Sequence, residues 1–389
     1  MDNLIHTTFG RLGQLFDGPH ATPKRLDTGP YFLNISSLKS GRLDLTDSDH
    51  LSESDFTHWT RRVTPEPGDL LFSYETRLGE AALMPEGIRA CLGRRMALLR
   101  PDRELVDPRF LLYFYLSPQF QRRIAQNTIH GATVQRIGLA TMPSWPVAIP
   151  ALATQRAIAE VLGALDDKIA ANEHSITCGE KLAIAYASGA TSSTEVGRIA
   201  THSTRPTSPD KFQETVAHYS LPAFDGAAQP SIERAQSIKS NKFTLTNPSV
   251  LISKLNPRIP RVWNVVEIGH NQAVASTEFV VLEPIGYSTS VLWSLLCQPE
   301  VMTHIAGRVA GTSGSHQRVK PAEILAAHVG DPDSLNAEVR DLIDCLGKRV
   351  DSARKDSQVL ARTRDELLPL LMSGKLRVKD TEKKVEAIA

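Results

Sequence analysis

The feature that most constrains this chain is an internal duplication with a period of about 180 residues. The segment 68–73 (GDLLFS) returns as 248–253 (PSVLIS), and 131–136 (GATVQR) is echoed by a glycine turn at 311–313 followed by HQR at 316–318. Identity between the halves is low, but the order and the offset hold along the chain. Because the period is too long for a solenoid, it indicates a globular module followed by a helix, written twice.

Two long stretches carry apolar residues at strict 4-3 spacing, the a and d positions of a heptad seam. The seam positions are Ile158, Leu162, Leu165, Ile169 and Ile176 in the first stretch, and Val339, Ile343, Leu346, Val350, Leu360, Leu367 and Leu371 in the second. Asn172 and Arg364 are polar members of the seams, and Ala183 and Tyr186 would end the first one. The pattern predicts two amphipathic helices of about 33–38 residues, about 50–57 Å long.

A lone helix of this kind would expose its seam to water, whereas two can bury their seams against each other. We therefore expect an antiparallel pair whose register Asn172 and Arg364 help to select, at some cost in stability. Two ordinary core helices of a larger fold are the alternative interpretation.

The segments between the helices predict mixed α/β modules. Strands are expected at 31–35, 69–73 and 96–100 in the first module, with a helix that starts at 108 and continues through 120–125. The second module should have strands at 250–253 and 279–282 and a helix at 291–296. The predicted fold class is α/β (α+β), with two similar domains separated by two long antiparallel coiled-coil helices in a pseudo-two-fold duplication. The expected boundaries are 1–150 and 193–332 for the domains, 151–192 and 333–376 for the helices, and 377–389 for a flexible tail.

Composition excludes several classes of protein. The four cysteines form no CxxC pair, so neither a zinc site nor a disulfide framework is expected, which fits a reducing cytoplasm. No signal peptide and no run of about 18 apolar residues occurs, so no membrane span is expected. With 44 Lys and Arg against 43 Asp and Glu, the net charge of +1 neither favours nor opposes nucleic acid. A DNA-binding chain with this balance must concentrate its cations on one face or share phosphate contacts with partners.

Candidate DNA-contacting side chains gather in loops and at strand ends, where cations can meet phosphates and amides or guanidinium groups can meet bases. In the first module they are Lys24, Arg25, Arg61, Arg62, Tyr74, Arg77, Arg94, Arg95, Gln135 and Arg136; in the second they are Lys239, Lys242, Lys254, Asn256, Arg258, Arg261, His316, Gln317, Arg318 and Lys320. A solvated surface charge is the alternative for each one. Pairing across the duplication favours Arg77, Lys254, Arg258, Gln135, Arg136, Gln317 and Arg318.

Motifs in and around the helices resemble a known family. The stretch 150–162 (PALATQRAIAEVL), continuing to LDDKI at 165–169, resembles the central conserved region of type I restriction-modification specificity subunits. The run 364–376 (RDELLPLLMSGKL) resembles their C-terminal conserved region, and 67–73 (PGDLLFS) is similar to a strand of their target-recognition domains. The glycine turns at 131–133 and 311–313 are similar to the turn that closes each such domain. The second domain departs from the pattern, with NPS at 247–249 and VGDP at 329–332.

The resemblance implies that each target-recognition domain binds one half of a bipartite double-stranded DNA site, with the helices as a spacer. It also implies that the helices dock two methyltransferase subunits, which restriction subunits join. S-adenosylmethionine, ATP and Mg would then belong to those partners, and this chain would hold no cofactor.

No catalytic signature contradicts that view. The methyltransferase motifs NPPY and DPPY, a phosphate-binding loop and GxSxG are all missing, and His50, His58 and His130 show no metal-ligand spacing. We therefore expect a chain that is not itself an enzyme. Two alternatives stay open: a DNA-recognition subunit of a type II-like or solitary methylation system, and a coiled-coil assembly protein with no DNA role.

Overall fold

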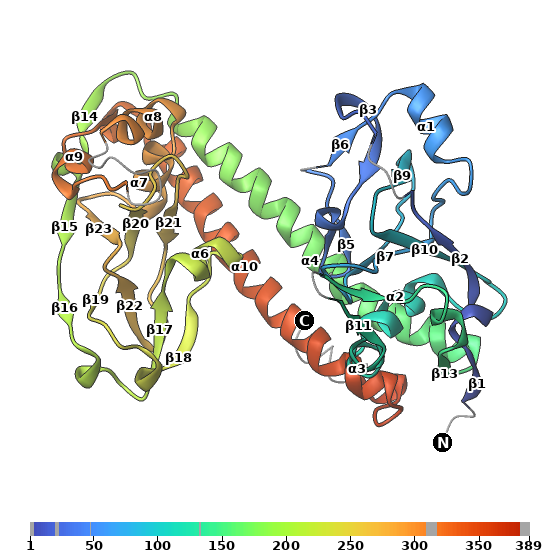
Figure 1. Ribbon diagram of the computed structural model, residues 1–389. Helices are drawn as coiled ribbons and strands as arrows, with labels where there is room; N and C mark the ends of the chain where they lie inside the picture. The colour runs from blue at the N-terminus through green and yellow to red at the C-terminus, as the bar shows by residue number, and fades with distance from the viewer. Residues whose placement is uncertain (1–3, 20–22, 47, 132–133, 309–316, 382–389) are drawn as a thin grey trace. The chain divides into compact units, whose positions relative to one another are not determined.

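The computed structural model describes residues 4–19, 23–46, 48–131, 134–308 and 317–381, and it divides into two compact units (Figure 1). The first unit comprises 1–167 with 361–389, and the second comprises 168–360. His316, the glycine turn at 311–313, residues 132 and 133 and the last part of the tail, 382–389, lie outside the described residues. Within the described part of the chain, no helix is both long and apolar enough to cross a membrane.

The first unit contains a four-stranded antiparallel sheet. Its order is β2 (Gly13–Asp17), β10 (Met96–Pro101), β7 (Leu70–Ser73) and β8 (Ala81–Leu83). Every residue of β7 is buried, which explains its continuous apolar run. A second sheet pairs β3 (Leu26–Leu33) antiparallel with β6 (Asp49–His50) and parallel with β9 (Ala90–Leu92).

Smaller elements complete the first unit. They are the paired strands β1 (Ile5–Thr8) and β13 (Pro146–Ile149), β4 (Leu38–Lys39) and β5 (Arg42–Leu43), and β11 (Thr128–His130) and β12 (Gln135–Ile137), with the helix α1 (Glu53–Trp59). The strands predicted at 69–73 and 96–100 are confirmed. The one predicted at 31–35 ends at Leu33, because Asn34 caps a short 3-10 turn by accepting a hydrogen bond from the Ser36 N–H.

The second unit repeats this plan. Its four-stranded sheet has the equivalent order β15 (Ala200–Ser203), β23 (Phe279–Pro284), β20 (Ser249–Ser253) and β21 (Val262–Val265). The other sheet has the order β16 (Pro206–Thr207), β19 (Lys242–Leu245), β22 (Gln272–Ser276), β17 (Thr215–Tyr219) and β18 (Ser231–Arg234). Here β17 runs parallel to β22 and antiparallel to β18, as β3 does between β9 and β6. The same topology in two units confirms the duplication.

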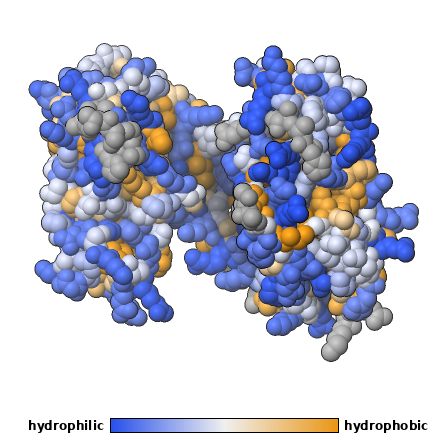
Figure 2. All heavy atoms as spheres, in the orientation of Figure 1, coloured by the Kyte–Doolittle hydropathy of each residue, from blue (hydrophilic) through white to orange (hydrophobic). Residues whose placement is uncertain are grey.

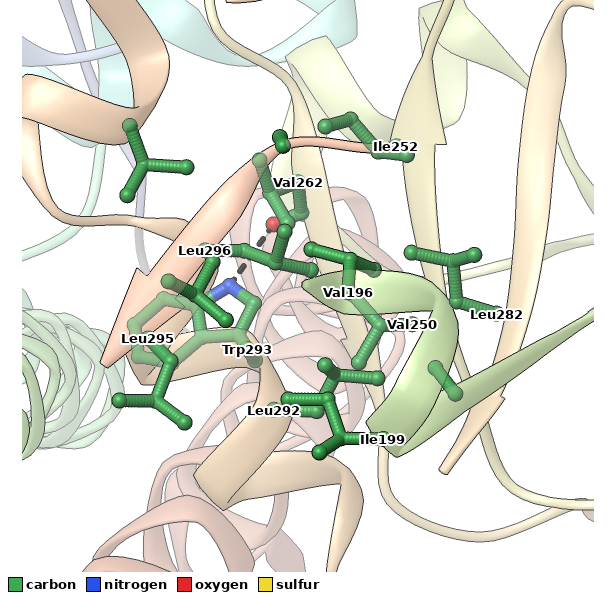
Figure 3. Packing of buried hydrophobic residues seen from close by; sticks show 14 of the residues in the cluster. Val196, Ile199, Val250, Ile252, Val262, Leu282, Leu292, Trp293, Leu295 and Leu296 are labelled. Atoms are coloured by element: carbon green, nitrogen blue, oxygen red, sulfur yellow. Dashed lines mark hydrogen bonds between the residues drawn. The ribbon is translucent and has the colours of Figure 1, made fainter. Parts of the chain in front are cut away.

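The second unit also contains the paired strands β14 (Ser193–Glu195) and β24 (His328–Gly330) and the short helices α5 (Val196–Ile199), α6 (Leu221–Ala227) and α9 (Pro321–Leu325). The strands predicted at 250–253 and 279–282 are confirmed as β20 and β23. The core between this sheet and the neighbouring helices is shown in Figure 3, where Trp293 donates its indole N–H to the carbonyl of Val262 at 2.9 Å.

The helix predicted from 108 through 125 is wrong in one respect, because it is two helices. α2 (Pro108–Leu116) ends before Ser117, and α3 (Pro118–Gln126) begins after it. Ser117 is extended, with φ −61° and ψ 146°, because a residue before proline is disfavoured in the helical region. The second unit breaks its helix at the same place, between α7 (Thr289–Leu296) and α8 (Pro299–Gly307).

Two long helices, α4 (Leu152–Ala187) and α10 (Ala337–Met372), contribute residues to both units. In the first unit Arg364 of α10 bonds Asp166 of α4 at 2.7 Å, and in the second Arg354 bonds Glu180 at 2.5 Å. Position numbers rise along one helix as they fall along the other, so the helices are antiparallel as predicted.

The predicted seam is the buried stripe of these helices. Ile158, Leu162, Leu165, Ile169, Ile343, Val350, Leu367 and Leu371 are buried, and Ile176, Val339, Leu346 and Leu360 are half-buried. Tyr186 is a correction, because it is 41% exposed while Ala183 and Ala187 are buried. The 3.6-residue period of an α-helix carries the stripe four residues on from Ala183 rather than three.

The alternative of ordinary core helices is partly right as well. Ala183 and Ala187 of α4 and Ile343 of α10 belong to the hydrophobic core of the second unit. At the start of α4, buried Gln155 donates its amide N–H to the carbonyls of Leu105 and Pro150, which ties the helix to the first unit. The helices therefore pair with each other and also pack into the units.

Candidate nucleic-acid interface

In the first unit, three segments that are distant in sequence meet at the end of the buried strand β7. The Tyr74 N–H donates to the carbonyl of Arg95 at 3.1 Å, and the Ile137 N–H donates to the carbonyl of Tyr74 at 2.8 Å. The Thr76 N–H donates to the carbonyl of Gln135 at 3.2 Å. These bonds define the first loop cluster, made of residues 73–77, 93–95 and 135–137.

The second unit builds the same arrangement at the end of β20. The Lys254 N–H donates to the carbonyl of Glu278 at 2.8 Å, the Val319 N–H to the carbonyl of Lys254 at 3.1 Å, and the Asn256 N–H to the carbonyl of Gln317 at 3.0 Å. We call residues 253–258, 276–278 and 317–319 the second loop cluster. Its three backbone bonds correspond one by one to those of the first cluster.

The clusters bring together many of the predicted contact residues. They include Tyr74, Arg77, Arg94, Arg95, Gln135 and Arg136 in the first unit, and Lys254, Asn256, Arg258, Gln317 and Arg318 in the second. Isolated bridges pair Glu75 with Arg136 and Leu255 with Arg318 at equivalent places. The duplication seen in the sequence is therefore a duplication of geometry at this site.

Backbone strain is concentrated in the same loops. Thr76 has a φ of 69°, Arg95 of 72° and Asn256 of 48°, in the left-handed region that non-glycine residues seldom adopt. Within the described ranges, these are three of five non-glycine residues with positive φ. Such conformations cost about 1–3 kcal/mol each and cluster at functional sites.

Each cluster contains one guanidinium–carboxylate pair, but the partners are placed differently. In the first unit Arg95 on the β9–β10 turn lies 3.1 Å from the Glu75 carboxylate on the loop after β7. In the second unit the carboxylate is on the turn, where Glu278 accepts two hydrogen bonds from Arg318, each 3.1 Å long. The Arg318 hydrogen bond lowers the pKa of Glu278 below its ordinary value, although desolvation opposes the shift.

The side chains of the first cluster differ in their availability. Tyr74 is buried, and burial together with the nearby Asp17 raises the pKa of its hydroxyl above the ordinary value. Arg77 is held by the carbonyl of Ile35 and by Glu80. Arg94, Gln135 and Arg136 are exposed, and they are the side chains best placed to contact a large polar ligand.

Other predicted residues lie outside the clusters. Arg25 pairs with Asp49 at 3.0 Å, the Arg61 side chain donates to the carbonyl of His58, and Lys24 and Arg62 are exposed. Among the described residues, no hydrogen bond or ion pair joins these four side chains to the first loop cluster.

Some of the residues predicted to contact DNA in the second unit also lie outside its loop cluster or are already paired. Lys242 is buried and donates to Ser240, and burial lowers the pKa of its ammonium group. Arg261 makes a bidentate pair with Asp225 at 2.6 and 2.9 Å, although its carbonyl accepts a bond from Ser253 at the edge of the cluster. The remaining two residues, Lys239 and Lys320, are exposed.

Sequence reasoning missed the acidic members of the site. Glu75 pairs with Arg95 and Glu278 pairs with Arg318, whereas the predicted DNA contacts include no acidic residue. The usable signal is positional, since each lies on a loop or turn beside a strand end of the duplicated sheet. Figure 2 shows hydrophilic residues spread over the visible face of each unit and interspersed with apolar ones.

Comparison with known proteins adds a family-model match over one part of the chain and a similar fold over most of it. Residues 50–177 match the family model described as the type I restriction modification DNA specificity domain. The crystal structure of a type I restriction-modification system S subunit from M. genitalium aligns over 95% of this chain and 96% of that one, with a TM-score of 0.61 and 15% identity. At this identity the likeness is one of fold.

Two further solved structures align over similar spans with lower scores. The HsdS subunit from Thermoanaerobacter tengcongensis has a TM-score of 0.34 and 14% identity over 96% of this chain and 97% of that one. A chain from a structure of complex assembly and conformational transition of the type I R-M system has a TM-score of 0.39 and 14% identity over 96% and 98%. No curated protein matches the sequence.

Proposed function

We propose that the chain is a DNA sequence-specificity subunit of a type I restriction-modification system, and that each of its two units binds one half of a bipartite DNA site; the specificity-domain match at 50–177 and the shared fold support this. The observation that carries this proposal is the repeated loop cluster. Two units with the same three-segment arrangement, each bearing different exposed side chains, suit two half-sites of different sequence.

The chemistry of the exposed side chains supports DNA as the ligand. Arginine reads guanine and glutamine reads adenine through bidentate bonds in the major groove, and both also bind phosphate. Gln135 and Arg136 of the first unit and Arg258 and Arg318 of the second provide these groups. Because the chain is nearly neutral, we propose that partner subunits supply much of the phosphate binding.

The long helices suit the role of spacer and docking surface. Each has 36 residues, about 54 Å of helix, against about 34–36 Å for one turn of DNA. We propose that they set the gap between the half-sites and dock two methyltransferase subunits, which restriction subunits join. S-adenosylmethionine, ATP and Mg would be held by those partners in the cytoplasm, and this chain would supply no catalytic group.

Methylome sequencing tests the proposal. The chain is expressed with its cognate methyltransferase subunits, and N6-methyladenine is mapped with and without it. We expect a bipartite motif that disappears when this chain is deleted. Unchanged methylation would reject the proposal and favour the coiled-coil assembly alternative, and a continuous rather than bipartite motif would favour a type II-like or solitary system.

A heptad deletion tests the spacer role. Removing seven residues from each of α4 and α10 keeps both seams in phase and shortens each helix by about 10 Å. We expect the methylated motif to keep both half-sites and to change only the number of bases between them. A motif with altered half-sites and an unchanged gap would show that the helices do not set the spacing.

A further inference from the structure

The ion pair of the second loop cluster fixes the plane of an exposed arginine. Both Nε and Nη2 of Arg318 donate to the Glu278 carboxylate, so the guanidinium group is held at two points. The Arg318 side chain is nevertheless 48% exposed. Of the five N–H donors of a guanidinium group, those on Nη1 and one on Nη2 stay available, and together they form the end-on fork of the side chain.

The backbone around this arginine is also held on both sides. Leu255 and Arg318 form an isolated bridge, and bonds from Asn256 to Gln317 and from Val319 to Lys254 flank it. Asn256 adopts the left-handed region that asparagine tolerates better than most residues. The guanidinium group is therefore positioned from both its backbone and its tip before any ligand binds.

We propose that Arg318, oriented by Glu278, reads a guanine in the half-site bound by the second unit; this rests on the proposed function. Guanine presents two acceptors, O6 and N7, to the major groove, and they match two donors of a planar fork. Adenine pairs its N7 acceptor with an N6 donor, which a donor-only group does not match. Glu278 is a positioning residue that does not contact the base.

Charge argues against a phosphate role for Arg318. The lowered pKa of Glu278 keeps its carboxylate ionised at neutral pH, so the Glu278–Arg318 pair has little net charge. A phosphate anchor works by net positive charge and tolerates a mobile side chain. An arginine that reads a base needs a fixed orientation of its guanidinium plane, and the two hydrogen bonds to the Glu278 carboxylate fix that plane in Arg318.

The first unit provides the matched control. Arg136 occupies the position equivalent to Arg318 and is exposed, but in the described part of the chain no carboxylate accepts a hydrogen bond from it. The carboxylate of that cluster, Glu75, pairs with Arg95 instead. Arg136→Lys should therefore leave the base preference of the second half-site unchanged, and any effect should fall on the first half-site.

The experiment compares Arg318→Lys, Arg318→Ala, Glu278→Gln and Arg136→Lys in the full complex. Methylome sequencing gives the motif, and competition binding to sites with single base changes, repeated at several salt concentrations, gives the affinities. Arg318→Lys keeps the charge, so the salt dependence of binding should stay the same. The preference for guanine at one position of the second half-site should fall about 10- to 100-fold. Glu278→Gln should relax the same position to a smaller extent, with all other positions unchanged.

Two results would overturn the inference while leaving the proposed function intact. One is a bipartite motif whose second half-site keeps its base preferences in Arg318→Lys. The other is a uniform loss of affinity at every site in Arg318→Ala, with a salt dependence lowered by about one charge, which marks a phosphate contact. A wild-type complex without a bipartite motif would reject the proposed function instead.

Discussion

The pair formed by Arg364 and Asp166 provides a quantitative test of the helix seam in the first unit. Arg364 Nη1 lies 2.7 Å from one Asp166 oxygen, and the Tyr113 hydroxyl donates to the other at 2.6 Å. The two side chains are 22% and 21% exposed. Replacing either with alanine leaves the other charge half-buried with fewer partners, and the seam loses a polar contact at an otherwise apolar surface.

The expected loss in the free energy of unfolding follows from this partial burial. Exposed ion pairs contribute about 0.2–1 kcal/mol, whereas removing one partner of a fully buried pair costs about 3–5 kcal/mol. Because the two side chains are about one-fifth exposed, Asp166→Ala should lower the free energy of unfolding by an amount between these limits, about 2 kcal/mol. Arg364→Ala should cost slightly less, because Asp166 then keeps the hydrogen bond from the Tyr113 hydroxyl, whereas Asp166→Ala removes an acceptor from both Tyr113 and Arg364. The double variant should show a coupling energy of about 1–2 kcal/mol.

The assay is a double-mutant cycle on the full chain, with urea unfolding monitored by circular dichroism and hydrogen exchange used to localise the loss to the first unit. For a unit of about 200 residues, 2 kcal/mol corresponds to a fall in Tm of about 4–8 °C. Arg362→Ala, an exposed position on the same helix, is the control and should stay within about 0.5 kcal/mol. Strictly additive single variants, with coupling below about 0.5 kcal/mol, would refute the assignment of this pair to the seam.

Two further predictions concern the cysteines and Thr76. Maleimide at pH 8 should label the exposed Cys178 and Cys345 of the folded chain but not Cys91 or Cys297. Burial raises the pKa of the Cys91 thiol to about 12 and also raises that of Cys297, so fast labelling of Cys91, measured by peptide mass spectrometry, would contradict this prediction. Thr76→Asn, which gives the first loop the residue type of the equivalent position in the second, should raise the free energy of unfolding by about 1 kcal/mol, because a β-branched residue is strained at positive φ. A lower Tm would show that Thr76 is not strained.

The parts of the fold that depend on local patterns could be predicted. The heptad seams are periodic patterns along each helix, and all twelve of their predicted apolar positions, from Ile158 to Leu371, are buried or half-buried. The break at Ser117 was predictable in principle, because Pro118 excludes a helical residue before it. Tyr186 has the spacing of the seam, but at this end of α4 the residues Ala183 and Ala187 pack into the core of the second unit and Tyr186 is exposed.

The candidate site could be predicted only in outline. The duplication indicated that 74–77 and 254–258 are equivalent, and the structure confirms that equivalence through matching backbone bonds. Which cations remain available was not predictable. Lys242 is buried, and Arg261 is bound by a carboxylate 36 residues away in the sequence.

Local sequence patterns were enough to predict the two long helices and the strands β7, β10, β20 and β23, because apolar periodicity acts over a few neighbouring residues. The duplication could be found by comparing the two halves of the sequence. Which charged side chains pair with each other depends on the folded structure. Glu278 and Arg318 are 40 residues apart, and Glu75 and Arg95 are joined only after two strands have paired. Such pairs depend on sheet register, which fixes side chains from distant segments within bonding distance and which no local pattern encodes.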